Sequence, residues 1–135
     1  MTYLLDTTTF SALMRRDVRA LARLASLPAT ELIVICTIVR GEIMYGLHRL
    51  PQGRRRSNLE TEATYLFSAM VCVAVPEIAA DSYAVAKATA QRAGMSLDEN
   101  DLWIAATALS LGAVLVTMDS DFQRVGRLTV EDWTV

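Results

Sequence analysis

Four acidic residues stand at positions where an ionised side chain is costly: Asp6, Glu42, Asp101 and Asp119. Asp6 directly follows the apolar run 3–5, and Asp119 comes shortly after the apolar run 113–116. A carboxylate near a protein core has to be paired, hydrogen-bonded or bound to a metal ion, because its desolvation is unfavourable. Carboxylates gathered in one place also repel one another, and a cation relieves that repulsion. The four acids therefore predict a site for a hard metal ion.

Glu42 lies in a helical pattern whose neighbouring positions are mostly apolar. The residues three and four positions away, on the same helix face, are Ile38, Val39, Tyr45 and Gly46. Glycine leaves space beside the carboxylate, and the other three are apolar or aromatic. A solvated helix glutamate is the simpler interpretation, but these neighbours favour a carboxylate that faces a site.

Asp101 is in register with the packing stripe of its helix, which continues through Ile104 and Ala105. The alternative is a favourable first-turn position, where an acid interacts with the helix dipole. That alternative suits Asp98 and Glu99 better, because they are not tied to the stripe. Asp101 is therefore expected to turn inward.

Asp6 and Asp119 each have a second interpretation as helix caps, because aspartate is among the best N-cap residues. Asp6 would cap a helix that begins at residue 7. Either Asp119 or Asp121 would cap a short segment at 120–125, and we expect one of the two to cap while the other binds metal. The hydroxyl of Thr117 would orient a ligand water.

The elements that must position these acids alternate between strands and helices. Strands are expected at 2–5, 32–35, 71–75, 113–117 and near 128–130. Helices are expected at 7–14, 17–27, 38–50 (with Thr37 as its N-cap), 53–70, 77–93 and 99–111, with a short turn or helix at 120–125. Short, continuous, apolar strands between helices predict an α/β fold whose parallel sheet is covered on both faces. Ligands of such sheets bind beyond the carboxyl ends of the strands, where Asp6 and Asp119 stand.

Composition narrows the class of protein. The chain has 135 residues, which predicts a single domain over 1–135, and its net charge of −2 gives no overall attraction for nucleic acid. It is 53% hydrophobic, which favours apolar surface for a partner or a second copy. No signal peptide is recognised at the start, and the uncharged stretch 102–118 is interrupted by Ser110 and Gly112. We expect no membrane span and a cytoplasmic protein.

Basic residues offer possible phosphate contacts. The run Arg54, Arg55 and Arg56 could follow a nucleic-acid backbone, although a solvated helix start is the favoured explanation. Further candidates are Arg15, Arg16 and Arg124. The sole histidine, His48, is expected at a helix surface rather than as a general base.

Four ordered segments resemble the motifs of PIN-domain ribonucleases, most closely the VapC-type toxins of prokaryotic toxin–antitoxin pairs. They are Tyr3-Leu4-Leu5-Asp6-Thr7, Gly41-Glu42-Ile43 with Gly46, the run 98–108 beginning Asp98-Glu99-Asn100-Asp101, and the run 115–122 containing Asp119 and Asp121. The ending Gly126-Arg127-Leu128 with Trp133 also fits. One departure is Thr8, where the family often has asparagine or serine.

The resemblance implies a PIN-like α/β/α sandwich with a short, mostly parallel central sheet. It implies one or two Mg²⁺ or Mn²⁺ ions, held directly by Asp6 and Asp101 and through water or as a second ion by Glu42 and Asp119. Thr7, Thr117 and Asp121 would support this site. The implied reaction is RNA hydrolysis to a 3′-hydroxyl and a 5′-phosphate. The implied partners are a second copy and an antitoxin whose tail occupies the acidic groove.

Other functions compete with this interpretation. A receiver-type signalling domain would need an aspartate after the third strand and a lysine near the fifth, but Pro76 and Glu77 follow Val75 and the only lysine is Lys87. A catalytically degenerate PIN module that binds RNA or protein would lack some of the four acids. A DNA-directed nuclease of the same fold stays open.

Overall fold

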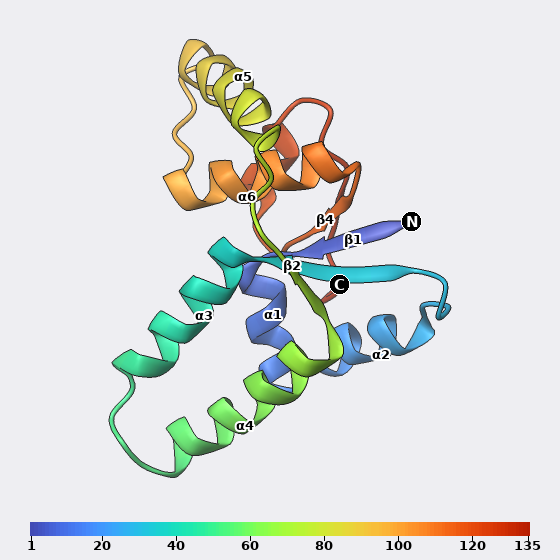
Figure 1. The fold of residues 1–135 in the computed structure, drawn as a ribbon, viewed down its shortest axis with the longest axis vertical. Coiled ribbons are helices and arrows are strands. Elements are labelled where there is room, and N and C mark those ends of the chain that lie inside the picture. Colours follow the sequence, from blue (N-terminus) through green and yellow to red (C-terminus); the bar gives the residue numbers. More distant parts are fainter.

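The computed structural model describes residues 1–135 around a five-stranded parallel sheet (Figure 1). The strands are β1 (Thr2–Leu5), β2 (Leu32–Cys36), β3 (Val71–Val73), β4 (Val114–Val116) and β5 (Val130–Glu131). They lie in the order β3-β2-β1-β4-β5, and all four neighbouring pairs are parallel. The N-terminal strand is thus the centre of the sheet.

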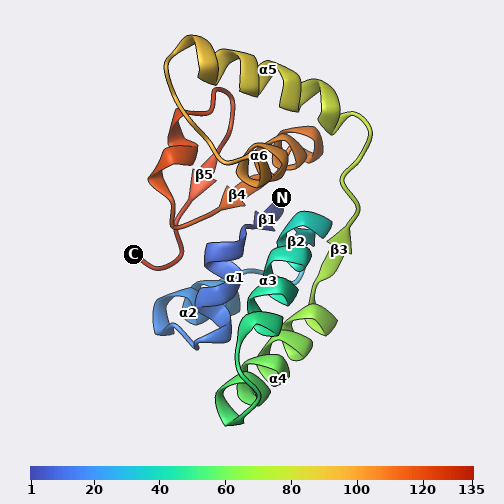
Figure 2. The same cartoon turned by 90° about the vertical axis from the view of Figure 1, so that its left-hand side faces the viewer.

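Helices cover both faces of this sheet. They are α1 (Thr7–Met14), α2 (Val18–Ser26), α3 (Thr37–Arg49), α4 (Arg54–Ala69), α5 (Ala79–Arg92), α6 (Glu99–Leu111) and the 3₁₀ helix η1 (Ser120–Arg124). Figures 1 and 2 show α1 to α4 on one side of the sheet and α5 and α6 on the other. The expected α/β/α sandwich is confirmed.

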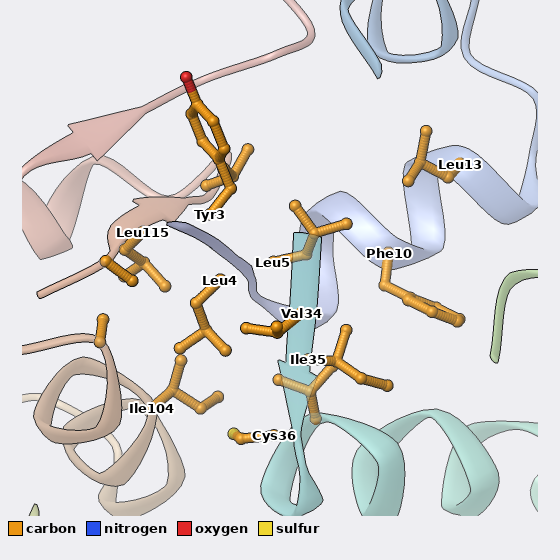
Figure 3. Close-up of a cluster of buried hydrophobic side chains, with 14 of the residues drawn as sticks. Tyr3, Leu4, Leu5, Phe10, Leu13, Val34, Ile35, Cys36, Ile104 and Leu115 are labelled. Atoms are coloured by element: carbon orange, nitrogen blue, oxygen red, sulfur yellow. The ribbon is translucent and has the colours of Figure 1, made fainter. Parts of the chain in front are cut away.

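The central strands are apolar throughout because both of their faces are covered. Figure 3 shows Leu4 and Leu5 of β1 between Ile104 of α6 on one side and Phe10 and Leu13 of α1 on the other. Each of these five side chains is at most 1% exposed. Burial of one such side chain stabilises the fold by roughly 1.5–3 kcal/mol. This packing fixes β1, and so fixes the residue that follows it.

Several expected boundaries move for local reasons. The third strand stops at Val73 rather than at residue 75, because its only partner β2 ends at Cys36, opposite Val73. The last strand begins at Val130 rather than near 128, because Leu128 still bonds back to Val125 in the preceding turn. The N-cap of α3 is Cys36, without a side-chain bond, so the prediction of Thr37 as the cap is wrong.

The end of α6 follows the expected chemistry. Gly112 is its C-cap and adopts the left-handed conformation, with φ of 61°. Glycine enters this region without the steric penalty that a Cβ atom brings. The chain can therefore turn at once into β4, which carries the C-terminal half of the site. None of the helices combines the length and apolar character that crossing a membrane requires.

Candidate active site

The site begins where β1 and β4 end side by side. Leu5 pairs with Val116 in the parallel register, so Asp6 and Thr117 are the next residues on neighbouring strands. The backbone N–H of Asp6 donates to the carbonyl of Val116 at 3.0 Å, which extends the ladder by one bond. The register alone therefore brings together two residues that lie 111 positions apart.

Asp6 is both a helix cap and a site residue. Its side chain is 2% exposed, and Oδ1 accepts from the Thr9 N–H at 2.9 Å, which caps α1. Oδ1 also accepts from the Thr8 hydroxyl at 2.7 Å, and Oδ2 accepts from the Thr117 hydroxyl. Burial raises the pKa of Asp6 above its ordinary value, while these hydrogen bonds favour the ionised form. The two interpretations of this residue are not exclusive.

Two threonine hydroxyls join the turn after β1 to the turn after β4. Thr8 accepts from the Met118 N–H at 3.0 Å, and Thr117 accepts from the Asp119 N–H at 3.0 Å, while both hydroxyls donate to Asp6. Thr8 thus gives the first acid a hydrogen-bond donor, as expected for a hydroxyl at this position. The Thr117 hydroxyl donates to the Asp6 carboxylate, and its part in orienting a water stays a prediction.

Glu42 is fixed by two neighbours from other elements. Its Oε1 accepts from the Thr7 hydroxyl at 2.5 Å, and its Oε2 accepts from the Asn100 amide at 3.3 Å. These bonds connect α3 to the starts of α1 and α6. Sequence reasoning missed Asn100 because it followed carboxylates only. The available signal was its position directly before Asp101.

Asp101 is half-buried, and its side chain makes no hydrogen bond or ion pair with the rest of the chain. Burial raises its pKa to about 6, and repulsion from Asp98, Glu42, Asp119 and Asp6 adds to the effect. The ionised form of Asp101 is therefore destabilised by the charges of the other acids. Its partial burial agrees with the inward direction that the packing stripe predicted.

Asp98 is a fifth acid near the site. It occupies the N-cap position of α6, yet its side chain makes no capping bond. It is also the largest of the acidic contributors to the pKa of Asp101. The first-turn role expected for Asp98 and Glu99 fits Glu99, which pairs with Lys87 and accepts from the Tyr83 hydroxyl at 2.7 Å.

Asp119 takes the capping role that we expected of either Asp119 or Asp121. Its Oδ1 accepts from the Asp121 N–H at 2.9 Å, which caps η1, and its charge acts on Asp101. The Asp121 side chain is exposed, and only its backbone bonds to the site. The cap is thus Asp119, and which of the two acids binds a metal ion stays a prediction.

The donor set fits a hard divalent cation. No three acidic, histidine or cysteine side chains are already gathered as a ready-made metal cage. Mg²⁺ usually keeps several waters and binds through one or two carboxylates, so a complete protein cage is not required. An unpartnered, half-buried Asp101 that is repelled by four other acids is the kind of group that a cation stabilises.

The arginine run lies away from these acids. α4 begins at the lower end of the molecule in Figure 1, beyond the far end of α3. Arg56 pairs with Glu60 at 3.1 Å and bonds to the carbonyl of Leu50, while Arg54 and Arg55 are exposed. His48 is exposed as expected and lies 3.3 Å from Arg56.

Known proteins resemble the chain over nearly its whole length. The PIN domain family matches residues 3–128. Ribonuclease VapC1 of Haemophilus influenzae (strain R2866) is 33% identical, over 99% of both chains. The structure of VapBC-1 from nontypeable Haemophilus influenzae superposes with a TM-score of 0.88 at 29% identity, over 100% of both chains. VapBC2 from Rickettsia felis, bound to a DNA fragment from its promoter, superposes with a TM-score of 0.90 over 98% of this chain and 99% of that chain. At 23% identity, that last match shows the fold alone.

Proposed function

The chain belongs to the PIN-domain family, and from that membership we propose a metal-dependent endoribonuclease, the toxin of a toxin–antitoxin pair. One observation carries the proposal: Asp101, in the first turn of α6, is acted on by Asp98, by Glu42 of α3, and by Asp6 and Asp119, which follow β1 and β4. The relatives support the substrate class and the partner, because one is named a ribonuclease and another was solved as VapBC.

The proposed cofactor is Mg²⁺ or Mn²⁺. Asp6 and Asp101 would hold the ion directly, and Glu42 and Asp119 would act through water or a second ion. A divalent cation bound there lowers the pKa of a water molecule and neutralises charge on the scissile phosphate. The oxygen-only donor set supports a hard ion over zinc or copper.

The proposed reaction is hydrolysis of an RNA phosphodiester bond without a covalent intermediate. A water oxygen bonds to phosphorus and loses its proton, while the bond from phosphorus to the 3′ oxygen breaks. That oxygen takes up a proton and leaves as a 3′-hydroxyl, and the other product carries the 5′-phosphate. The chain's own part is to hold the carboxylates still: Thr7 and Asn100 hold Glu42, and Thr117 holds Asp6.

The same proposal covers the organisation of the protein. One sheet with one core of 25 buried residues supports a single domain over 1–135. Exposed apolar side chains support a homodimer and an antitoxin, among them Val85 at 67% and Tyr65 at 69% exposed. We propose that the protein acts in the cytoplasm, where bacterial RNA is translated.

The test of the nuclease is cleavage of single-stranded and structured RNA by the purified chain. We expect cleavage with Mg²⁺, none with EDTA, and a fall of about 10³-fold in Asp101→Asn, because the lost ion supplies several kcal/mol to the transition state. The matched control is Asp17→Asn, since Asp17 caps α2 as Asp6 caps α1 but lies outside the site. Wild-type rates in Asp101→Asn would refute the assignment. Binding of RNA without cleavage would indicate a degenerate module, and cleavage of DNA alone a DNA-directed nuclease.

The test of the toxin role is growth of bacteria that express the chain. We expect growth arrest, which Asp101→Asn abolishes and which co-expression of a small DNA-binding protein encoded immediately upstream relieves. Arrest that persists in Asp101→Asn would separate toxicity from the active site and contradict this part of the proposal.

A further inference from the structure

A groove runs from Asp119 along one face of α1. Its volume is about 500 Å³, and it is open to solvent. Its walls are formed by Thr7, Thr8, Ser11, Arg15, Met118 and Asp119. Met118 is the one hydrophobic residue among them, and the other five carry hydroxyl, guanidinium or carboxylate groups.

Two side chains in this groove, those of Ser11 and Arg15, have donors that make no hydrogen bond within the chain. The hydroxyls of Thr7 and Thr8 already donate to Glu42 and Asp6. Ser11 makes no side-chain hydrogen bond, although a helix serine can donate to the carbonyl one turn earlier. Arg15 follows Ser11 by four residues and is therefore its neighbour on the helix surface.

Arg15 differs from the arginines that are tied to glutamates elsewhere in the chain. Arg16 pairs with Glu62 at 2.6 Å, and Arg23 pairs with Glu131 at 2.8 Å. Arg15 forms no ion pair, is exposed, and shares a groove with Asp119. It is thus a free guanidinium beside a strongly acidic site.

We infer that the Ser11–Arg15 end of the groove binds a backbone phosphate of the RNA strand next to the one being cut. The inference rests on the proposed function, because it assigns a subsite of the same substrate. A guanidinium binds phosphate oxygens in a bidentate manner, and a serine hydroxyl adds a third donor. Arg15 follows Thr7 by eight residues, which is about 12 Å along a helix axis.

This subsite offsets the repulsion between the acids and a polyanion. With a net charge of −2, the chain has no overall field that attracts RNA, so a local cation has to hold the strand. No aromatic ring lines the groove, so it cannot stack on bases. Phosphate contacts carry no sequence information, and the subsite therefore contributes affinity without base preference.

The test compares Arg15→Gln with the wild type on single-stranded RNA in Mg²⁺. We expect KM to rise about tenfold, as for loss of a hydrogen bond to a charged group, with kcat nearly unchanged. The slope of log affinity against log salt should fall by about 0.7, the value for one phosphate on a single strand. Arg15→Lys should restore the salt slope, because it keeps the charge. Ser11→Ala should raise KM by a smaller factor.

Two controls separate this subsite from nonspecific charge. Arg92→Gln removes the same charge from the last turn of α5, outside the groove, and should leave KM unchanged. A single-stranded DNA of the same sequence, used as a competitor, should lose affinity for Arg15→Gln by the same factor as RNA. Loss confined to RNA would indicate a contact to the ribose and overturn the phosphate assignment.

Failure of the inference is distinct from failure of the proposed function. An unchanged KM and salt slope in Arg15→Gln, with metal-dependent cleavage by the wild type, would overturn the subsite and leave the nuclease intact. An equal effect in Arg92→Gln would also overturn it. A wild-type chain that cuts no nucleic acid would remove the proposed function, and the subsite with it.

Discussion

Asp6 and Asp101 face the same site, but their surroundings differ in kind. Asp6 is fully buried and accepts hydrogen bonds from Thr8, Thr9 and Thr117. Asp101 has no partner and is surrounded by other carboxylates. The acid at the end of β1 is therefore held by hydrogen bonds from the protein, whereas the acid at the start of α6 has no such partner. Ion binding should stabilise the α6 side most.

Removal of the Thr117 hydroxyl would break the hydrogen-bonded half. In Thr117→Val, Asp6 loses one donor and the Asp119 N–H loses its acceptor. Partners of metal ligands typically contribute 10–100-fold to activity, so we expect a fall in kcat/KM of about that size in RNA cleavage. The matched control is Thr107→Val, which removes a buried hydroxyl that bonds to Trp103 away from the site. Equal losses in both variants would show that the effect is general destabilisation.

Asp101→Asn would remove the uncompensated half. The folded-state pKa of Asp101 is about 6 and its ordinary value is 3.8, so between these values the folded state holds more protons than the unfolded state. Its contribution to stability is therefore lost as the pH rises through this window. In EDTA at pH 7, Asp101→Asn should be more stable by about 1 kcal/mol, after discounting for solvent exposure, or about 3 °C in Tm.

Thermal unfolding in EDTA from pH 4 to pH 7 measures this effect. The wild type should lose stability across the window, and Asp101→Asn should lose less. Asp6→Asn is expected to change stability in the opposite direction, because an amide nitrogen in place of Oδ2 cannot accept the hydrogen bond from the Thr117 hydroxyl. A stabilising effect of both substitutions would contradict the contrast between the two halves.

The convergence of the acids was predictable because parallel register is a strong constraint. A run of apolar residues locates each strand, and the strand ends of an α/β sheet meet at one edge, so Asp6 and Asp119 had to be close. The helix stripe predicted the inward direction of Asp101 for a similar reason. Both arguments depend on packing of apolar side chains, which the sequence displays directly.

The details of polar contacts were not predictable in this way. Asn100 and Asp98 are exposed residues at the start of α6, and apolar periodicity does not fix the direction of such side chains. The position of the arginine run was not predictable either, because its distance from the acids depends on the length of α3. Its contact with RNA phosphates stays a prediction. The end of β3 depended on where its partner strand stops, which lies outside its own sequence.

Asp121→Asn should have the smallest effect on cleavage of these substitutions. It tests whether the hydrogen-bonded half of the site extends as far as Asp121. Its side chain is exposed, so the substitution should change kcat/KM by no more than about twofold, as for an ordinary surface residue. Asp119→Asn, two residues earlier, should reduce cleavage much more, because Asp119 acts on Asp101. A larger loss in Asp121→Asn would identify Asp121 as the fourth acid of the site.

The position of β1 at the centre of the sheet has a consequence for the order of synthesis. Asp6 is among the first residues to leave the ribosome, but the hydroxyl that holds it belongs to Thr117, 111 residues later. β4 and the acids at 101 and 119 also emerge late. A nascent chain therefore carries an incomplete site for most of its translation and becomes competent only near the end. A chain whose proposed substrate is RNA thus completes its site only after most of its own messenger has been translated.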